Sequence, residues 1–518
     1  MTLNNWPPSL TTEQESHLLE LATDYTLASG LVYRPPAIAP GTTPSTTSAI
    51  HAPYSLFPTP FPRHLFQQAQ QLQPLYNALY AHVTTDHPFL DEVVGGAVAK
   101  VDEFQGKLYE LWKQVEQEGV KQPLHLGLFR SDYLVHALPG AATADHTIKQ
   151  VEFNTISSSF GSLSSKVTDL HRYLLKTNSY PTDVPELKLE NLPPNPALKG
   201  LAAGLAAGHK AYGVARSAIL MVTQDNERNA FDQRPLEYEL LETHGIALHR
   251  IPLSQLGPLL TLDPTTSALL LTLPHAPNSP PTEISVVYYR TGYSPPDYVH
   301  PTVPSSTLWS TRLLIERSLA IKCPTLALQL SGCKKVQQVL SSPDRLASFS
   351  NKGSTPSTLS PPPTAALSQL DLDALLDSAT NLYPLDDTPA GNAALELAYA
   401  HPERFVLKPQ REGGGNNIYR SDIPPFLDSL AEEDKKRREG EPREGKGKGT
   451  KGEVVSELGV YGVCLFRAGG GDRVGGGEGG AEVLVNETVG QLLRTKGAES
   501  DEGGVAVGFS VIDSLLLV

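Results

Sequence analysis

The sequence predicts a mixed α/β fold, because apolar runs of strand length alternate with helical patterns. Residues 219–223, 268–273 and 286–289 are almost entirely apolar, as are strands covered on both faces of a parallel sheet. A helical pattern lies between the first two runs, around 236–241. Strands that alternate with helices favour a lobe built on a parallel sheet. At 518 residues, the chain is expected to divide into two or three lobes.

The other elements follow from spacing and composition. Residues 42–60 are rich in Thr, Ser and Pro and predict a loop. One apolar helix face is predicted from residues spaced four, three and four apart, namely Phe104, Leu108, Leu111 and Val115. Segments that cannot bury enough surface to offset chain entropy are also predicted to be loops. These segments are 351–363, 432–451 and 468–480.

Composition and charge exclude several classes of protein. A net charge of −14 and a pI near 5.6 argue against nucleic acid or an anionic membrane as a partner. The N-terminus lacks the pattern of a signal peptide, and no apolar run approaches the roughly 20 residues of a membrane helix. The three cysteines form no Cys-x-x-Cys pair and predict buried, reduced thiols. A cytoplasmic protein is therefore expected.

The most informative segment is 405–417, which reads FVLKPQREGGGNN. Its apolar start predicts a buried strand that ends at Lys408, and Arg411 and Glu412 then lead into three glycines. Glycines allow backbone N–H groups to close on a phosphate, a lysine adds a point charge, and a glutamate is a hard oxygen ligand for Mg²⁺. A mobile turn would explain the three glycines, but not the charged residues before them or the two asparagines after them. The segment therefore predicts a nucleoside triphosphate site that is neither a Walker loop nor a kinase loop.

A second polar motif lies at 150–159, QVEFNTISSS. Its alternation predicts a strand with Glu152 and Asn154 on one face, which is a plausible Mg²⁺ pair. Taken alone, the motif fits an edge strand with a solvated polar face better. Further polar motifs are 128–133, with Arg130, and 224–234, which follows a predicted strand where open α/β sheets bind ligands.

In order along the chain, these motifs resemble those of the eukaryotic glutathione synthetase family of ATP-grasp ligases. At least eight motifs match, from residue 58 to the end. The resemblance implies an ATP-grasp core with glycine-rich lid loops and an inserted parallel α/β lobe that binds substrate. It implies three parts: the N-terminal part of the ATP-grasp domain at 1–214, the substrate lobe at 215–333, and the C-terminal part at 334–518.

The same resemblance implies roles for individual residues. The metal ligands would be Glu152, Asn154 and Glu412, holding two Mg²⁺ ions per site. ATP would be bound by Glu152, Lys334, Lys408, Gly413, Gly414, Gly415, Asn416, Asn417, Tyr419, Glu457, Lys496 and Glu502. The dipeptide would be bound by Arg130, Ser157, Ser158, Ser159, Glu227, Arg228, Asn229, Gln233, Arg290, Tyr293, Arg494, Val505 and Ala506. The catalytic residues would be Arg494, Lys408 and Glu412.

The implied activity is ATP-dependent joining of γ-glutamylcysteine to glycine through an acyl phosphate, by a cytoplasmic homodimer. Two alternatives differ from this expectation. One is a related ligase that takes β-alanine or serine in place of glycine. The other is a protein that binds the dipeptide without turnover, as a damaged or repurposed relative would.

One departure from the family supports that second alternative. The family has an apolar strand ending in Met-Glu that lines the adenine pocket, but this chain has only Met1 and Met221. The charged run 432–451 stands in its place, and such a run cannot form an apolar slot. The hypothesis is that the phosphate, metal and dipeptide sites are intact, while ATP affinity is reduced.

Overall fold

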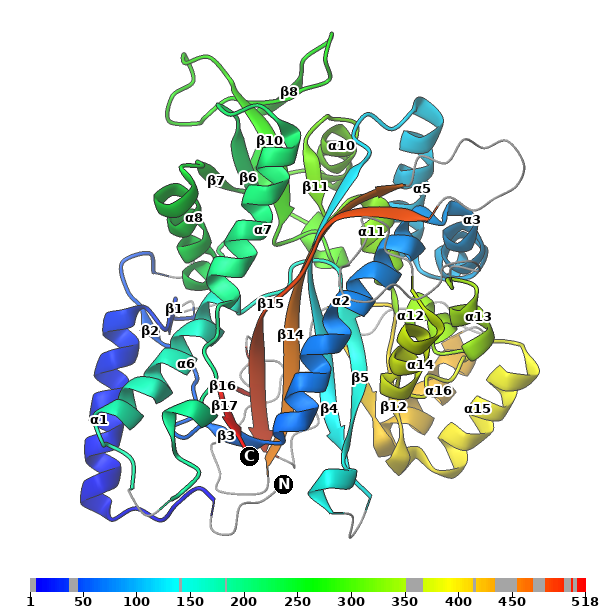
Figure 1. The fold of residues 1–518 in the computed structure, drawn as a ribbon. Coiled ribbons are helices and arrows are strands. Elements are labelled where there is room, and N and C mark those ends of the chain that lie inside the picture. The colour runs from blue at the N-terminus through cyan, green and yellow to red at the C-terminus, as the bar shows by residue number, and fades with distance from the viewer. Residues whose placement is uncertain are drawn as a thin grey trace.

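A large mixed sheet organises the computed structural model (Figure 1). The structure describes residues 6–36, 45–138, 142–181, 184–350, 367–412, 416–433, 454–468, 480–497, 505 and 510–518. Within them, eleven strands form the main sheet, whose continuous path runs β16-β15-β14-β4-β11-β10-β6-β7. Its strands are β4 (Leu124–His136), β5 (Thr147–Asn154), β6 (Ala218–Thr223), β7 (Leu248–Pro252), β8 (Leu260–Leu262), β9 (Leu269–Leu271), β10 (Thr282–Tyr289), β11 (Ile321–Cys323), β14 (Val454–Ala468), β15 (Ala481–Gly497) and β16 (Val511–Asp513).

The remaining elements pack around this sheet. The helices are α1 (Thr12–Ser29), α2 (Arg63–Thr85), α3 (His87–Leu90), α4 (Ala99–Val101), α5 (Glu103–Glu118), α6 (Gly161–Lys176), α7 (Ala197–Tyr212), α8 (Ala230–His244), α9 (Leu253–Leu256), α10 (Ser305–Glu316), α11 (Leu326–Ser331), α12 (Lys334–Leu340), α13 (Pro343–Ala347), α14 (Gln369–Ser378), α15 (Pro389–Ala400) and α16 (Ile423–Glu433). The short strands pair as β1 (Val32–Tyr33) with β2 (Ile50–His51), β3 (Thr59–Phe61) with β17 (Leu515–Leu517), and β12 (Val406–Leu407) with β13 (Ile418–Tyr419).

The sheet joins a parallel half to an antiparallel half. Strands β4, β11, β10, β6 and β7 pair in parallel, whereas β16, β15, β14 and β4 pair antiparallel, and β5 pairs antiparallel with β4. The parallel pairing predicted for 219–223 and 286–289 is confirmed. The run 268–273 forms β9 instead, which pairs antiparallel with β10 and extends a hairpin with β8.

Helices α2 and α7 cover opposite faces of the antiparallel half. A side chain at Gly462 would meet Asn77 and Gln73 of α2, whereas the next residue, Val463, lies against Gly204 of α7. Successive residues of a strand point to opposite faces, so the two helices enclose β14 between them. Each face carries its own hydrophobic core.

Glycines bring α7 unusually close to the sheet. Gly200, Gly204 and Gly208 are four residues apart and therefore share one face of the helix. A Cβ at Gly204 would lie 2.8 Å from Val463, and one at Gly208 would lie 3.0 Å from Leu126. The same glycine face contacts β15 at one end and β10 at the other. One helix thus packs against both halves of the sheet.

The elements α12 to α16 and the β12–β13 pair form a smaller group beside β5 (Figure 1). The pair β12–β13 stands apart from the main sheet. Its first strand was expected to be buried, but Val406 is 41% exposed because β12 pairs with β13 alone. The charged run 432–451 begins inside α16, which ends at Glu433, so its first residues are helical rather than loop. The rest of that run lies outside the described residues, as does 351–363.

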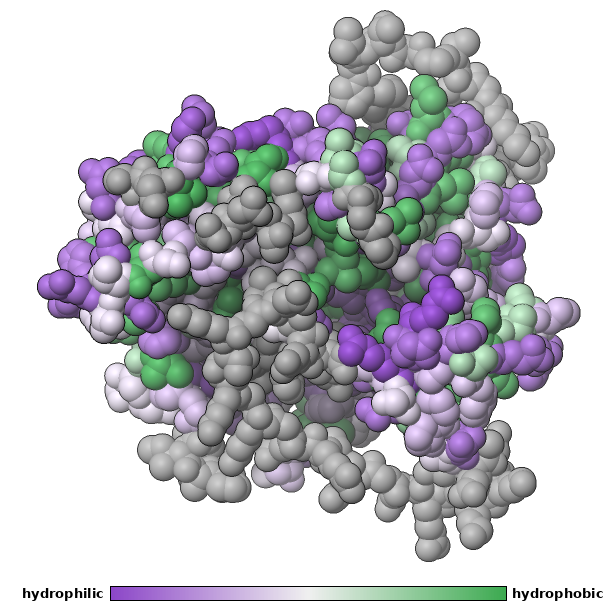
Figure 2. Space-filling view, turned by 90° about the horizontal axis from the view of Figure 1, so that it is seen from below, coloured by the Kyte–Doolittle hydropathy of each residue, from purple (hydrophilic) through white to green (hydrophobic). Residues whose placement is uncertain are grey.

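Other predicted elements are confirmed with small changes. The predicted helix face at 104–115 is buried in α5. The predicted loop at 42–60 contains the short strand β2 and the start of β3. All three cysteines are buried and free. Among the described residues, no helix is long and apolar enough to cross a membrane. Seen from below, hydrophilic residues predominate at the margins and hydrophobic residues show between them (Figure 2).

Lys322 of β11 gives the first testable prediction. It is 2% exposed and donates to the Ser318 carbonyl at 3.1 Å, and burial lowers its pKa to about 8. Because the unfolded side chain titrates near 10.4, the unfolded state binds more protons between pH 8 and 10.4, so stability should rise with pH across that window. We expect Lys322→Met to stabilise the protein at pH 7 by up to about 3 kcal/mol and to flatten that rise.

Urea unfolding at pH 7 and pH 10 would measure both effects. Lys107→Met is the matched control, because Lys107 is exposed and its one ion pair among the described residues is with Glu110, one helical turn away. The control should change neither stability nor its pH dependence. A destabilised Lys322→Met protein at pH 7 would contradict the argument.

Candidate functional site

Four adjacent strands present one polar face, which carries five of the predicted site residues, among them Arg494 of the predicted catalytic set. Arg130 lies opposite Asn154, and Asp132 lies opposite Glu152, in the β4–β5 ladder. In the β14–β15 ladder, Glu457 lies opposite Arg494. Residues two apart on a strand share a face, so the pairing registers bring these six side chains together. Arg130 therefore lies beside the strand that carries Glu152.

Asp132 lies at the centre of this cluster and is fully buried. Its Oδ1 accepts Nε of Arg130 at 2.6 Å, and its Oδ2 accepts Nη2 of Arg130 at 2.8 Å. Arg494 donates to the same Oδ2 at 2.9 Å and also pairs with Glu457. Asn154 donates its Nδ2 to Oδ2 of Asp132 at 3.1 Å. The carboxylate thus pairs with two arginines at once.

Two lysines complete the positive side of the cluster. Lys334 begins α12 and lies between two carboxylates, with Nζ 3.3 Å from Glu152 Oε2 and 3.4 Å from Glu412 Oε2. Lys408, at the end of β12, donates to the Val151 carbonyl at 2.7 Å. These contacts bring the segment that precedes the three glycines onto β5. Segments nearly 260 residues apart in sequence are thereby joined in one site.

Burial and charge set the protonation of the two flanking carboxylates differently. Burial opposes ionisation of Glu152, but Lys334 and Lys408 outweigh it and hold its pKa well below the usual range. Burial raises the pKa of Glu412, against the opposing charge of Lys334. Burial also lowers the pKa of Lys408. A multiply charged anion brought to these lysines would meet a partly desolvated positive pair.

The predicted metal ligands lie at this cluster, with one difference in grouping. The oxygen atoms that lie within 4.8 Å of one another belong to Asp132, Glu152 and Glu457. Glu412 is linked to Glu152 through their shared partner Lys334. Asn154 uses its amide nitrogen for its bonds to Asp132 and Glu152, so its oxygen is the atom suited to a cation. Carboxylate and amide oxygens in a lysine-lined site suit Mg²⁺ together with phosphate.

The serine loop between β5 and α6 forms the neighbouring half of the site. Ser157 and Phe160 have positive φ, at 54° and 73°, which fixes an unusual backbone path for Ser157–Ser159. Asp232 holds the end of this loop by accepting Phe160 N at 2.8 Å, and it also pairs with Arg290 Nη2 at 3.0 Å. Arg130 joins the two halves, because it donates to the Ser159 carbonyl at 3.4 Å.

A second polar group follows β6, as the sequence predicts. Glu227 accepts Asn229 N and Gln233 Nε2, each at 2.7 Å. Gln233 is held from its other side by Arg250 of β7. Tyr293 accepts a hydrogen bond from Gln224 at 3.0 Å. Arg228 is exposed and donates to the Arg34 carbonyl at 3.3 Å.

The remaining predicted residues fall into two groups. In the described part, Asn416 donates to the Glu412 carbonyl at 3.4 Å, and Asn417 donates to the Tyr419 hydroxyl at 3.0 Å. Lys496 follows Arg494 on the same face of β15. Val505 is 2% exposed and packs into the core on the α7 face. Residues that lie outside the described part are Gly413, Gly414, Gly415, Glu502 and Ala506.

Sequence reasoning missed three charged residues of the site. Asp132 is two residues from Arg130, so strand alternation alone could have placed both on one face. Asp232 lies inside the predicted motif 224–234, but its partners come from a distant loop. Arg250 had no local signal, because only the β6–β7 pairing brings it to Gln233.

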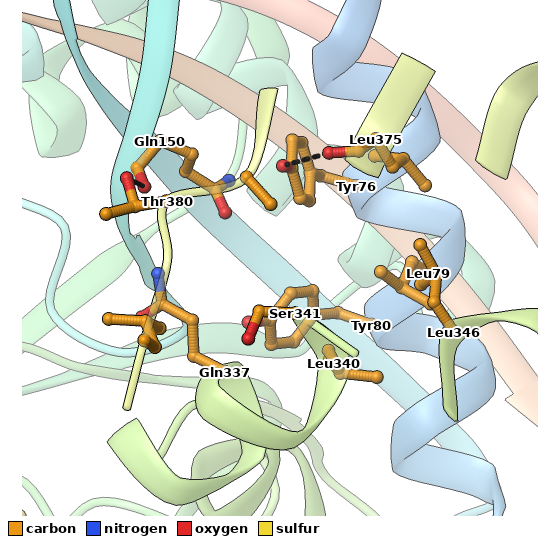
Figure 3. Close-up of a pocket in the computed structure, with 12 residues that line it drawn as sticks. Tyr76, Leu79, Tyr80, Gln150, Gln337, Leu340, Ser341, Leu346, Leu375 and Thr380 are labelled. Carbon is orange, nitrogen blue, oxygen red and sulfur yellow. Dashed lines mark hydrogen bonds between the residues drawn. The ribbon is translucent and has the colours of Figure 1, made fainter. Parts of the chain in front are cut away.

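A small cavity lies near this site, lined by α2, α12 and the end of α14 (Figure 3). Its volume of about 30 Å³ leaves room for one or two water molecules. Tyr76 donates to the Leu375 carbonyl at 3.4 Å, and Thr380 donates to the Gln150 carbonyl at 2.6 Å. Gln150 Nε2, buried there, has no hydrogen-bond partner among the described residues. The cavity is too small for a purine base and fits bound water.

Comparisons with known proteins cover almost the whole chain. The family described as "Eukaryotic glutathione synthase, ATP binding domain" matches residues 12–517. Glutathione synthetase of Bos taurus is 36% identical, and that of Dictyostelium discoideum 34%, with at least 98% of each chain covered. The glutathione synthetase large chain of Schizosaccharomyces pombe is 34% identical over 98% of both chains.

A solved structure supports the fold independently of close sequence similarity. A glutathione synthetase-like effector (GSS30) from Globodera pallida, in apoform, covers 98% of both chains with a TM-score of 0.66 and 21% identity. At that identity the match shows the fold alone. The family match and the full-length relatives go further, since they extend over both halves of the sheet and every segment that builds the polar cluster. The chain therefore belongs to the eukaryotic glutathione synthase family.

Proposed function

We propose that the polar face of β4, β5, β14 and β15 is where this ATP-dependent ligase makes glutathione from γ-glutamylcysteine and glycine. Family membership carries ATP as co-substrate and glutathione synthesis as the activity. The observation that supports this placement is the convergence of Lys334, Lys408 and Arg494 on a face that also carries three carboxylates. Such a face suits a Mg²⁺-bound triphosphate.

The donor set fits the metal that the resemblance implies. Glu152, Asn154 and Glu412 would hold two Mg²⁺ ions, since oxygens of the two glutamates lie on either side of Lys334 and Asn154 lies beside Asp132 in the same cluster. When bound, Mg²⁺ would screen the phosphate charges and draw electron density from the γ-phosphorus. The chain's own cations, Lys334 and Lys408, would bind the phosphate oxygens.

The reaction balances without a nucleophile from the protein. An oxygen of the cysteinyl carboxylate attacks the γ-phosphorus, the bond to the β–γ bridging oxygen breaks, and ADP leaves. The glycine amine then attacks the acyl carbon, phosphate departs with the bonding electrons, and the amine loses a proton. Arg494 lies where it would stabilise charge on the transferring group, and the protein's main contribution is positioning.

The serine loop and the polar group that follows β6 suggest how the dipeptide is held. Arg130, Arg290 and the Ser157–Ser159 loop would bind its carboxylates. Glu227 would pair with its α-ammonium, and Asn229 and Gln233 would supply amide contacts. The remaining proposed contacts would come from Arg228, Tyr293, Val505 and Ala506. Asn416, Asn417, Tyr419, Glu457, Lys496, Glu502 and the glycines 413–415 would bind ATP.

Family resemblance extends the proposal to organisation and location. The domain would be an ATP-grasp fold, split into 1–214 and 334–518 around a substrate lobe at 215–333, with glycine-rich lid loops. The β4–β11 pairing supports such a division, because it is where the parallel strands join the antiparallel ones. A cytoplasmic homodimer is proposed by resemblance.

Of the two alternatives, binding without turnover is not favoured, because the relatives that match the chain over its full length are synthetases. A different amine acceptor, β-alanine or serine, remains the second candidate. Most of the segment that replaces the adenine-pocket strand lies outside the described residues, so reduced ATP affinity stays a prediction.

The test is phosphate release from Mg-ATP and γ-glutamylcysteine, with and without glycine. We expect release that depends on glycine and matches the tripeptide formed. Serine and β-alanine, assayed in parallel, should be poorer acceptors than glycine. Absence of release, with dipeptide bound in calorimetry, would overturn the proposed function and support a binding role.

A further inference from the structure

We propose that Asp132 is a positioning residue of this site, which orients Arg130 and Arg494 together, and that Gly459 provides the space this arrangement needs. The inference rests on the function proposed above, which places Arg130 at the dipeptide and Arg494 at the transferring phosphoryl group. Asp132 itself is fully buried and would act through the two arginines.

The first observation behind this proposal is the geometry of the Asp132 carboxylate. Both oxygens of Asp132 face the guanidinium of Arg130, at 2.6 and 2.8 Å, in a bidentate pair. A bidentate pair fixes the plane of the guanidinium as well as its position. Arg494 shares Oδ2 at 2.9 Å, so one carboxylate holds two guanidinium groups next to each other.

The arrangement links the two halves of the site. Arg130 donates to the Ser159 carbonyl in the serine loop, and Arg494 pairs with Glu457 on the side of the site that would bind the phosphates. The reacting carboxylate of the dipeptide must lie between these halves to meet the γ-phosphate. A residue that orients both arginines therefore controls where that carboxylate sits relative to the phosphorus, and a small misplacement there is costly.

Gly459 supplies an independent observation. It lies directly opposite Asp132 in the β14–β4 ladder. A Cβ there would lie 2.8 Å from Arg130 Cδ and 2.9 Å from Asp132 Oδ1, closer than real Cβ contacts allow. Gly459 does not have positive φ, so its backbone could accept another residue. Glycine is needed at this position to leave room for the Arg130–Asp132 pair.

The test uses two variants that disturb the same pair by different means. Asp132→Asn keeps the shape and removes the charge, whereas Gly459→Ala keeps every charge and inserts one methyl group. We expect each to raise KM for γ-glutamylcysteine by about 10- to 100-fold and to lower kcat, because a charged hydrogen bond is lost or displaced. KM for ATP should change much less than KM for the dipeptide.

Two controls separate positioning from stability. Gly462→Ala inserts a methyl group on the opposite face of β14, against α2, and Glu316→Gln neutralises a buried carboxylate that accepts Leu326 N. Both should lower Tm but leave KM for the dipeptide unchanged. In an Arg130→Lys background, Asp132→Asn should add little to KM for the dipeptide, since its effect on dipeptide binding acts through Arg130, whereas its effect on kcat through Arg494 should remain.

Folded Asp132→Asn and Gly459→Ala proteins with wild-type KM and kcat would overturn the inference. So would an effect of Asp132→Asn on KM that persists in full in the Arg130→Lys background. Failure of the proposed function is distinguishable, because wild-type protein would then show no glycine-dependent phosphate release. Calorimetry of γ-glutamylcysteine binding would still compare wild type with Asp132→Asn, and equal affinities would overturn the positioning role.

Discussion

Replacing Glu412 with Ala is expected to lower kcat by about 100-fold or more, while dipeptide affinity changes little. Glu412 is a proposed metal ligand and lies 3.4 Å from Lys334 through its Oε2. Its described ion pair is with Lys334, whereas the serine loop that would hold the dipeptide bonds to Arg130 and to the Tyr289 carbonyl. Its loss should therefore weaken stabilisation of the transferring phosphoryl group more than binding of γ-glutamylcysteine.

Single-turnover phosphate release, together with calorimetry of γ-glutamylcysteine, would measure the two effects separately. Glu403→Ala is the matched control, because Glu403 belongs to the same small group of elements and its side chain is 63% exposed. That variant should behave as wild type. Equal losses of turnover and dipeptide affinity in Glu412→Ala would contradict the assigned role.

The second large effect is expected at Arg494. Arg494→Ala should lower kcat by about 100- to 1,000-fold, as loss of a preorganised charge donor does. It should also destabilise the protein by up to about 3–5 kcal/mol, because Arg494 is a partner of Asp132, whose carboxylate is fully buried, and of Glu457. Arg494→Lys should recover more stability than activity, since lysine restores the charge but not the planar fork.

The same ladder offers a close control. Arg467 pairs with Glu482 across β14 and β15, as Arg494 pairs with Glu457, but Arg467 is 46% exposed. Exposed ion pairs contribute little, so Arg467→Ala should change stability by less than about 1 kcal/mol and leave kcat unaltered. A similar loss of kcat in both variants would mean that the ladder, rather than Arg494 itself, is what turnover requires.

Local pattern was enough to find much of this site. The strand that carries Glu152 could be predicted because apolar and polar residues alternate, and the strand that precedes Arg290 could be predicted because a polar residue ends an apolar run. Family resemblance supplied the roles of Lys334 and Arg494, whose immediate neighbours give no chemical signal. The strand at 406–407 was correctly predicted, but its burial was not, since burial depends on what packs against it.

Sequence patterns could not predict which strands pair, or in which register. Asp132 becomes central only because β14 and β5 both pair with β4, and Gly459 matters only because the register places it opposite Asp132. Arg250 and Asp232 likewise meet partners far away in sequence. Contacts of this kind are set by topology, which a single sequence constrains only weakly.

The glycine face of α7 has a mechanical consequence. The backbone of α7 packs closely against β15, β14 and β10, so the helix connects both halves of the sheet. Such close packing leaves the sheet little freedom to bend between its two halves. The part formed by β12, β13, α15 and α16 is attached differently: its buried residues, such as Ala394 and Ile423, belong to neither hydrophobic core, and polar contacts such as Lys335 with Asp386 and Lys408 with the Val151 carbonyl join it to its surroundings. Water can replace contacts of that kind at low cost. Any movement of β12 and β13 that admits ATP should therefore take place at these polar contacts and leave the arginines on the sheet in position.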